Sequence, residues 1–109
     1  PTMYDDVIYE AEEGIATITI DRPEAYNAFT RTTIFELNDA IRRAERNDGV
    51  YAMVLTGAGD GFCSGADVTE MPDWEEMGLE EYAGYLWGVQ NVVRQLRAAA
   101  TPSVAAVRL

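Results

Sequence analysis

A glycine-rich loop after an apolar stretch is the segment of this chain best suited to chemistry. The stretch VYAMVLTGA runs into GDGFCSGADV, and together they hold glycines at positions 57, 59, 61 and 65 with a lone cysteine. The chain contains no histidine, the base that most nucleophilic sites use. Chemistry at this loop must therefore come from the main chain or from residues outside the sequence.

Two phosphate-binding motifs fail on the residues present. The Walker loop requires a lysine that meets the phosphates, and the chain contains no lysine. The dinucleotide fingerprint requires glycine at its first, third and sixth positions, and counting from Gly57 the sixth position is Phe62. The loop is therefore not predicted to bind a nucleotide phosphate in either of these ways.

Reactive side chains in the loop also lack the partners that their chemistry needs. Cys63 and Ser64 would each require a nearby base, and a cysteine after Phe62 at a strand end is more commonly a small buried apolar residue. Asp67 and Glu70 could act as an acid–base pair, but in so acidic a chain we interpret them as solvated surface charge. A single thiol and no histidine predict no metal site.

The main chain of the loop remains as the candidate. The small residues of SGAD, at positions 64–67, let a bulky ligand approach the backbone closely. A free amide here, aimed at a carbonyl oxygen, would form half of an oxyanion hole, and one such donor supplies about 3 kcal/mol of transition-state stabilisation. A plain glycine-rich turn explains the same residues equally well, so the pattern leaves both interpretations open.

Two strands and a helix are predicted before the loop. YDDVIYEAEEGIATITI predicts two strands around a turn at residues 13–14, because alternating apolar residues are typical of a half-buried strand. The helix follows DRPEAYNAF and is capped by Thr30, or by Thr33 with Glu36 in a capping box. It is predicted to end at RNDG, with Gly49 in the left-handed conformation. The apolar face of this helix carries Ile34, Leu37, Ile41 and Ala44.

A strand and a long helix are predicted around and after the loop. VYAMVLTG is a continuous apolar run, which predicts a strand covered on both faces. After the acidic segment TEMPDWEEMG, which we expect to be an irregular and mobile surface segment, apolar residues at three- and four-residue steps predict a helix that ends near Ala98. Gly84 and Gly88 each weaken this helix by about 1 kcal/mol unless something packs closely there. Its predicted face carries Leu79, Tyr82, Leu86, Val89, Val93 and Leu96.

The order of these elements predicts the fold class. A last strand is expected at residues 104–107, so the order is strand, strand, helix, strand, helix, strand. That order predicts an α/β layer with parallel pairing and right-handed crossovers. The last strand stops almost as it begins, so we expect a chain truncated after Leu109.

Length, charge and composition limit the classes of function. The 109 residues suit one small domain or part of a larger one. The sequence contains no uninterrupted apolar run of about 18 residues, so no membrane span is predicted. With a single cysteine and no visible secretion signal, we expect a cytoplasmic protein. The formal net charge of −11 repels nucleic acid and anionic membranes, so neither is expected as a partner.

Three stretches together resemble the enoyl-CoA hydratase/isomerase (crotonase) family. GIATITIDRPEAYNAF is similar to the family's strand and its RP-x-x-x-NA loop, VYAMVLTGAGDGFCSGADV to its VLTG-x-G-x-F-C-[AS]-G-[AG]-D segment, and TPSVAAV to its KP-x-IAAV strand. The resemblance implies a spiral of ββα units that is incomplete here. Residues 1–109 would be the N-terminal part of an acyl-CoA-binding domain, in an enzyme that hydrates or isomerises an acyl-CoA double bond or performs a related reaction.

The resemblance also implies roles for individual residues. The amide of Ala66 would be the first oxyanion donor to the thioester oxygen, and the developing thioester enolate would be stabilised there. No cofactor is expected to be bound covalently, and coenzyme A enters as part of the acyl-CoA substrate. The full-length protein would be a homotrimer, or a hexamer built from trimers. The residues implied along the coenzyme A path are Ala25, Tyr26, Ala28, Ser64, Gly65, Asp67 and Val68.

Departures from the family pattern keep other functions open. Ala25 stands where the family often places a basic residue near the coenzyme A phosphates, and Arg22 is the candidate to compensate. Leu109 stands where a glycine is usual, and the second oxyanion donor and catalytic glutamates would lie beyond it. The alternatives are a non-catalytic truncated paralogue that packs against crotonase-type subunits, and a generic nucleotide-binding α/β domain.

Overall fold

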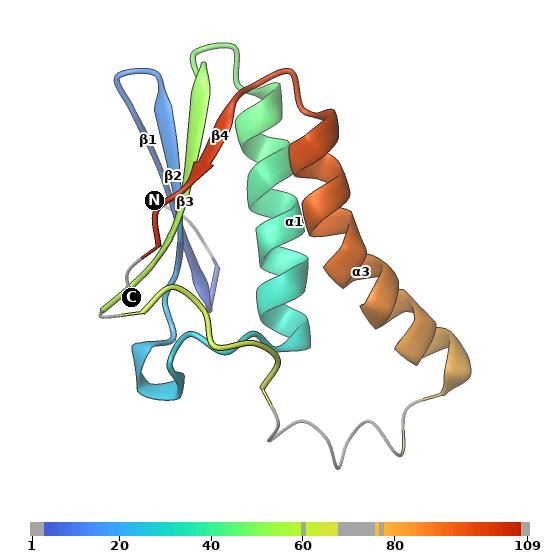
Figure 1. Ribbon diagram of the computed structural model, residues 1–109. Coiled ribbons are helices and arrows are strands. Elements are labelled where there is room, and N and C mark those ends of the chain that lie inside the picture. The colour runs from blue at the N-terminus through green and yellow to red at the C-terminus, as the bar shows by residue number, and fades with distance from the viewer. Residues whose placement is uncertain (1–3, 60, 68–75, 77, 108–109) are drawn as a thin grey trace.

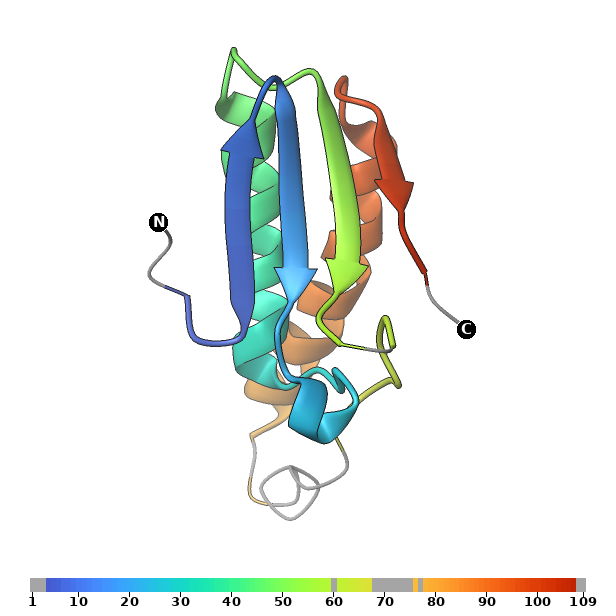
Figure 2. The same ribbon diagram turned by 90° about the vertical axis from the view of Figure 1, so that its left-hand side faces the viewer.

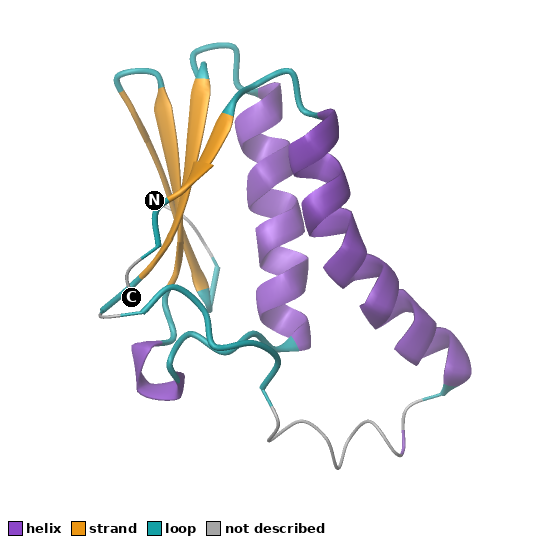
Figure 3. Cartoon of the chain, in the orientation of Figure 1, coloured by secondary structure: helices purple, strands orange, loops and turns teal. Residues whose placement is uncertain are grey.

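A four-stranded sheet with two helices on one side forms the structure (Figures 1 and 3). The computed structural model describes residues 4–59, 61–67, 76 and 78–107. The strands are β1 (Val7–Glu12), β2 (Ile15–Ile20), β3 (Ala52–Gly57) and β4 (Ser103–Ala105), and the helices are α1 (Arg31–Arg46) and α3 (Leu79–Ala98), with a 3-10 turn η1 at Pro23–Ala25. The predicted order of elements is confirmed. The segment TEMPDWEEMG lies almost wholly outside the described residues, so the prediction made for it is not tested.

The sheet is mixed, and its topology decides where the loops meet. β1 pairs antiparallel with β2, whereas β3 pairs parallel with both β2 and β4. The hairpin between β1 and β2 turns at Glu13 and Gly14, which have φ of 51° and 84° as a two-residue turn with both central residues left-handed requires. Because β2 and β3 are parallel, the loops that follow them emerge at the same edge of the sheet (Figure 2).

The hydrophobic core lies between the sheet and α1. Alternate residues of β2 (Ala16, Ile18, Ile20) point into it, as predicted from the period of two. The predicted apolar face of α1 is also confirmed, and its members are buried. At about 1.5–3 kcal/mol for each fully buried large aliphatic side chain, this contact is the main stabilising term. The core residues are Val7, Tyr9, Ala16, Ile18, Ile20, Ile34, Leu37, Ala40, Ile41, Ala44, Val50, Met53 and Leu55.

The strand β3 is covered on one face within the described part of the chain. Met53 and Leu55 are buried, whereas Ala52 and Val54 between them are only partly buried. Both helices lie on the same side of the sheet (Figures 1 and 2). The prediction of a strand covered on both faces is therefore wrong for these residues, because a short apolar run does not by itself say how many layers cover it.

The face that α3 turns to the rest of the molecule differs from the predicted one. Val89 and Leu96 pack against the core as expected, together with Tyr85 and Val92. The other predicted members are exposed, from 39% for Tyr82 to 86% for Leu79. The apolar repeat alone therefore placed the contact face wrongly, and the reason lies in how α3 contacts α1.

Contact between α3 and α1 is partly polar, which an apolar pattern does not reveal. Asn38 of α1 donates a hydrogen bond to the carbonyl oxygen of Gly88 at 2.9 Å and accepts from Asn91 and Gln95 at 3.0 and 2.7 Å. A Cβ at Gly88 would lie 3.2 Å from Ile34 Cγ2. Gly88 therefore allows the two helices to pack closely, which is the condition under which a glycine inside a helix was expected. No described atom comes within 4 Å of a Cβ built at Gly84.

Thr30, one of the two predicted caps, begins α1. The Thr30 hydroxyl accepts from the Thr33 N–H at 3.2 Å, and the Thr33 hydroxyl accepts from the Thr30 N–H at 3.0 Å. The alternative cap of Thr33 with Glu36 is wrong. The prediction for Gly49 is also wrong: α1 ends at Asn47 in extended conformation, and Gly49 is not left-handed but donates its N–H to Asn47 Oδ1 at 2.9 Å.

Glu36 instead joins α1 to the start of β1. Its side chain is buried, and its carboxylate accepts from the N–H groups of Asp5, Asp6 and Val7 at 2.9, 2.7 and 3.1 Å. The carboxylate thereby provides an acceptor for main-chain N–H groups that form no hydrogen bond with β2. Sequence patterning did not predict this role, because the spacing of Thr33 and Glu36 matched a local capping box, whereas the actual partners lie 29 to 31 positions away in the sequence.

We expect Glu36→Ala to destabilise the chain by about 2–4 kcal/mol, because buried donors left without an acceptor cost about 1–3 kcal/mol each and only some of them regain water. Glu36→Gln keeps one oxygen and should lose less. Urea unfolding measures both, with Glu10→Ala at an exposed position of β1 as the control. Equal stability of the Glu36→Ala and Glu10→Ala variants would contradict this role.

A second tie between the N-terminal segment and α1 depends on pH. The Tyr4 hydroxyl donates to Asp39, and this hydrogen bond is the main cause that lowers the pKa of Asp39, with Arg42 adding to it. Because the pKa of Asp39 is lowered in the folded chain, this contact contributes stability at a pH above the unfolded-state pKa of 3.8, and the contribution is lost as the pH falls through the folded-state pKa.

We therefore expect Tyr4→Phe to destabilise the chain at neutral pH and much less in acid. Urea unfolding at both pH values tests this, and a deficit independent of pH would contradict it.

Candidate functional site

Two loops meet at the carboxyl edge of the parallel strands (Figure 2). One follows β2 and covers residues 21–30, and the other follows β3 and includes the glycine-rich stretch. Phe29 and Ala66 form an isolated parallel bridge, in which the Phe29 N–H donates to the Gly65 carbonyl at 2.8 Å and the Asp67 N–H donates to the Phe29 carbonyl at 2.9 Å. The bridge attaches the glycine-rich loop to the residue that directly precedes the Thr30 cap of α1.

The main-chain donor predicted at Ala66 is left unused by this bridge. In a parallel bridge, the bonds to one residue come from its partner's two neighbours, so the partner's own N–H and C=O face the other way. Ala66 is exposed, and its N–H has no hydrogen-bond partner within the part of the chain that the structure describes. The amide is therefore a donor available to a ligand.

Asn27 connects the two loops from inside. Its side chain is 1% exposed, and its Oδ1 accepts from the Arg22 N–H at 2.8 Å while its Nδ2 donates to the carbonyl oxygens of Ala58 and Gly61 at 2.8 and 2.9 Å. All three contacts are to main-chain groups, so the amide of Asn27 determines the path of both loops. Its φ of 56° is left-handed, a conformation in which asparagine is enriched among the non-glycine residues.

Gly57 is required where β3 turns into the loop. A Cβ at this position would overlap the carbonyl oxygens of Gly61 and Phe62 and would lie 2.8 Å from Asn27 Nδ2. The loop therefore folds back directly onto the end of the strand. By contrast, a Cβ at Gly61 would meet no described atom within 4 Å. Of these two glycines, Gly57 is therefore needed for close packing of the loop on the strand, whereas Gly61 is not.

Arg22 and Asp67 form a mostly buried ion pair behind the two loops. Arg22 Nη1 lies 3.0 Å from Asp67 Oδ2 and also donates to the Ala28 carbonyl, and Arg22 Nε lies 4.0 Å from Asp6 Oδ1. The side chains of Arg22 and Asp67 are 18% and 9% exposed. The interpretation of Asp67 as solvated surface charge is therefore wrong, whereas Glu70 lies outside the described residues. Since the guanidinium contacts these groups, Arg22 is not placed to compensate for a basic residue at position 25.

The remaining predicted site residues occupy different environments. Ala25 is half-buried in η1, the Tyr26 side chain is 80% exposed, and Ala28 is buried beneath the loop. Ser64 is exposed, and Gly65 is half-buried with a φ of 117°. The structure thus brings Ala28 and Asp67 together through Arg22. Val68 lies outside the described residues.

The predictions for Cys63, metals and membranes fall on parts of the chain that the structure describes. Cys63 is partly buried and packs against the core, in the apolar role predicted for it. Among the described residues, no cluster of histidine, cysteine, aspartate and glutamate could hold a metal ion. No helix among them combines the length and apolar character needed to cross a membrane.

Residues that sequence reasoning did not single out hold the site together. Asn27 was noted only as part of the motif RPEAYNA, and the pairing of Arg22 with Asp67 joins positions 45 residues apart. Asp6 also contributes, because its Oδ2 accepts from the hydroxyls of Thr30 and Thr33 at 3.1 and 2.7 Å. The only local signal in the sequence was the asparagine itself, a residue type enriched in the left-handed conformation that position 27 adopts.

A family model and a curated relative both match this chain, and both point to the same family. The model of the enoyl-CoA hydratase/isomerase family matches residues 10–108. Over 105 residues the chain is 34% identical to a crotonyl-CoA hydratase from Syntrophomonas wolfei subsp. wolfei, and the match covers 95% of this chain and 39% of that protein. The chain therefore spans about two fifths of the length of this curated relative.

Solved structures confirm the α/β fold that the resemblance implied. An enoyl-CoA hydratase/isomerase from Xanthobacter autotrophicus Py2 is similar with a TM-score of 0.89 at 33% identity, over 97% of this chain and 39% of that one. An enoyl-CoA hydratase from Shewanella pealeana has a TM-score of 0.90 at 22% identity, over 97% of this chain and 40% of that one. The second likeness concerns the fold alone. The spiral of units expected from the resemblance is thus present in part.

The packing at Gly57 predicts a sharp contrast between two glycine substitutions. Gly57→Ala should displace the loop and lower the unfolding free energy by about 2–4 kcal/mol, because its Cβ meets main-chain oxygens that cannot rotate away. Gly61→Ala is the matched control and should change stability by less than about 1 kcal/mol. Thermal unfolding and the amide chemical shifts of residues 58–67 measure the difference. Similar effects of both substitutions would show that the loop does not fold back as described.

Proposed function

Because the chain belongs to the enoyl-CoA hydratase/isomerase family, we propose that the protein binds an acyl-CoA thioester and stabilises the enolate formed from it. The amide of Ala66 serves as one oxyanion donor. Residues 1–109 are the N-terminal part of the acyl-CoA-binding domain, in a protein of the length of its relatives. Relatives in this family carry the names hydratase and isomerase, and the reaction proposed for this chain lies within that range.

The observation that carries the proposal is the orientation of the Ala66 amide. The bridge to Phe29 uses the carbonyl of Gly65 and the N–H of Asp67, which supports an outward-facing N–H at the residue between them. Asn27 and the Arg22–Asp67 pair hold this segment from behind. A donor held in place by buried contacts needs no reorganisation when negative charge develops, which is the condition for strong transition-state stabilisation.

The chemistry assigned to the amide is electrostatic. Removal of a proton next to a thioester carbonyl, or addition to a conjugated double bond, moves negative charge onto the carbonyl oxygen. An N–H donor about 2.7–3.1 Å from that oxygen stabilises the charged state more than the neutral thioester. Neither step requires a nucleophile in the loop, which agrees with a chain without histidine and with a partly buried Cys63.

The proton transfers require groups that we place beyond residue 109. The matched relatives are about two and a half times as long, since the chain covers 39% of the crotonyl-CoA hydratase. We assign the second oxyanion donor and the general acid–base residues to that further part. A trimer, or a hexamer of trimers, and a cytoplasmic location are proposed on the same family relation.

Coenzyme A is proposed to run along the surface of the two loops. The exposed residues Tyr26 and Ser64 and the half-buried Ala25 and Gly65 provide its contacts, with Val68 next in sequence. Ala28 and Asp67 are buried, so their part is to support this surface from below. The phosphates require cationic partners other than Arg22, because its guanidinium contacts Asp67 and the Ala28 carbonyl.

Replacing the Ala66 amide by an ester tests the proposal. Incorporation of the α-hydroxy analogue of alanine at position 66 of a family-length protein removes the N–H and leaves the side chain unchanged. We expect kcat for crotonyl-CoA to fall about 10²–10³-fold with a smaller change in KM, as for other single oxyanion donors.

The same replacement at Asp67 provides the matched control. Its N–H donates to the Phe29 carbonyl, so the ester there should lower stability and have less effect on kcat. An Ala66 ester with unchanged kcat would overturn the assignment.

The 109-residue chain alone should not turn over crotonyl-CoA above the buffer rate. Turnover by this chain would show that the acid–base groups lie within residues 1–109.

A further inference from the structure

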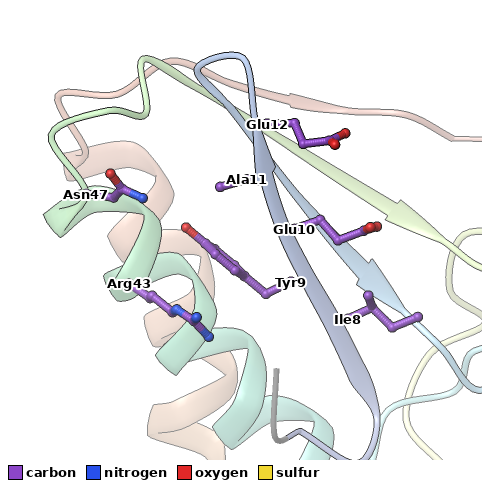
Figure 4. Close-up of a pocket in the computed structure, with 7 residues that line it drawn as sticks. All are labelled: Ile8, Tyr9, Glu10, Ala11, Glu12, Arg43 and Asn47. Carbon is purple, nitrogen blue, oxygen red and sulfur yellow. The ribbon is translucent and has the colours of Figure 1, made fainter. Parts of the chain in front are cut away.

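A groove of about 750 Å³ runs between the edge strand β1 and helix α1 (Figure 4). Five consecutive residues of β1, at positions 8–12, form one wall, and the other is formed by Arg43 in the last turn of α1 and by Asn47, which caps the end of that helix. β1 is the outer strand of the sheet on the side away from β4. The groove lies near the amino ends of β2 and β3, so it is distinct from the loops of the candidate site (Figures 1 and 2).

The register of β1 shows which of its main-chain groups face this groove. The Asp21 N–H donates to the Asp6 carbonyl at 2.8 Å, and in an antiparallel pair the inward-facing groups then belong to alternate residues, at positions 6, 8, 10 and 12. Groups at positions 7, 9 and 11 face outward. The Val7 N–H, the first of these outward-facing donors, reaches Glu36 at 3.1 Å.

Glu36 thus occupies the first outward position of the edge, and the next two stay open. Within the described residues, the main-chain groups of Tyr9 and Ala11 have no hydrogen-bond partner. Donors and acceptors that recur at every second residue, about 6.8 Å apart, match the spacing of another strand. Along residues 9–11 the pairing with β2 thus leaves main-chain groups unused, beside a groove that leaves room for side chains.

Side chains in the groove provide further unused polar groups. The Tyr9 hydroxyl is buried and has no partner among the described residues, although a buried polar group without a partner costs about 1–3 kcal/mol. The Asn47 side chain lies at the same end of the groove, and its Oδ1 already accepts from Gly49 (Figure 4). A hydrogen-bond acceptor that enters the groove could therefore accept from the Tyr9 hydroxyl and from the amide nitrogen of Asn47.

The charge on the α1 side of the groove is positive. The Arg43 guanidinium lies 4.5 Å from the centroid of the Tyr9 ring. It also interacts with Tyr4 and with Asp39, whose pKa its charge helps to lower. No carboxylate of the described residues lies within 4.0 Å of it. Its neighbour Arg42, by contrast, pairs with Asp39 at 3.3 Å. Arg46 lies one turn further along and shares an adjoining hollow with Arg43, which Arg42 and the carboxylate of Asp39 also line. In a chain of net charge −11, this is a local site for a carboxylate.

We propose that the groove binds an extended peptide segment, which adds to β1 as a further strand and places a carboxylate on Arg43. Recognition has two parts: main-chain bonds at Tyr9 and Ala11 supply affinity, and the Arg43 side of the groove selects an acidic residue on the strand face turned to α1. The opposite face of the bound strand lies beside Glu10 and Glu12, so neutral or basic residues belong there.

A second copy of β1 does not fit this description. Antiparallel pairing of two copies centred at Glu10 would place the two Glu10 side chains directly opposite each other, and like charges in that position are destabilising. The face turned to α1 would then present Tyr9 and Ala11 and no carboxylate. The occupant that we assign is therefore a separate acidic segment.

A capped peptide of sequence Val-Thr-Asp-Thr-Val-Thr tests the proposal on the full chain. It carries no positive charge, so binding must overcome the general repulsion from an acidic protein. We expect slower hydrogen exchange at the amides of Tyr9 and Ala11, with chemical-shift changes confined to β1 and the end of α1. Replacing the aspartate of the probe by asparagine, or methylating the probe's main-chain nitrogens, should weaken binding at least tenfold.

Two variants of the protein separate the two parts of recognition. Ala11→Pro removes an outward N–H without touching the ladder to β2, as edge strands tolerate, and should weaken binding at least tenfold while thermal unfolding shows a folded chain. Arg43→Gln should have a similar effect, and Arg97→Gln in the last turn of α3 is the control with no effect. If Ala11→Pro prevents folding, the methylated probe supplies the same test.

Several outcomes would overturn the proposal. Equal binding of the methylated probe would exclude strand addition, and equal binding of the asparagine probe would exclude the carboxylate on Arg43. Shift changes centred on other elements would place the peptide elsewhere. Sedimentation that shows a dimer, lost in Ala11→Pro, would identify a second copy as the occupant.

Discussion

The buried side-chain amide of Asn27 is the contact on which the candidate site depends. It bonds to main-chain groups of both loops at the carboxyl edge of the sheet, at Arg22, Ala58 and Gly61. Among residues 21–30, 58–59 and 61–67, which the structure describes, regular structure is confined to the short turn η1 and the Phe29–Ala66 bridge. Because buried polar groups must find partners, any shift of one loop leaves part of this amide unsatisfied. The loops are thus held at one relative position without a reactive residue between them.

Charge reinforces this arrangement from a second direction. Arg22 contacts Asp67 and the carbonyl of Ala28, while Asp6 accepts from the threonines that begin α1. A mostly buried pair of this kind adds little net stability, since the desolvation of both charges offsets their attraction. Its value here is geometric, because removing one partner would leave the other charge buried. The glycine-rich loop is consequently tied to the start of both β1 and α1.

Periodicity predicted much of the fold and little of the site. Alternation in β2 and the face of α1 from Ile34 to Ala44 were correct, because those residues pack against one apolar layer. The face of α3 was misplaced, because its contact with α1 runs through Asn38, Gly88 and amide side chains. Within the site, the position of Ala66 followed from the family resemblance. The pairing of Arg22 with Asp67 was not predictable, since no local pattern links residues 45 positions apart.

The one-sided cover of the sheet has a colloidal consequence. Apolar side chains on the uncovered face stay in water, with Ile8 38%, Ile15 39% and Val104 63% exposed. Separate molecules would adhere through such a face, but a net charge of −11 keeps them apart at low ionic strength. Salt shortens the range of that repulsion to about 8 Å under physiological conditions. The shelf life of a solution of this chain is therefore expected to shorten as salt is added.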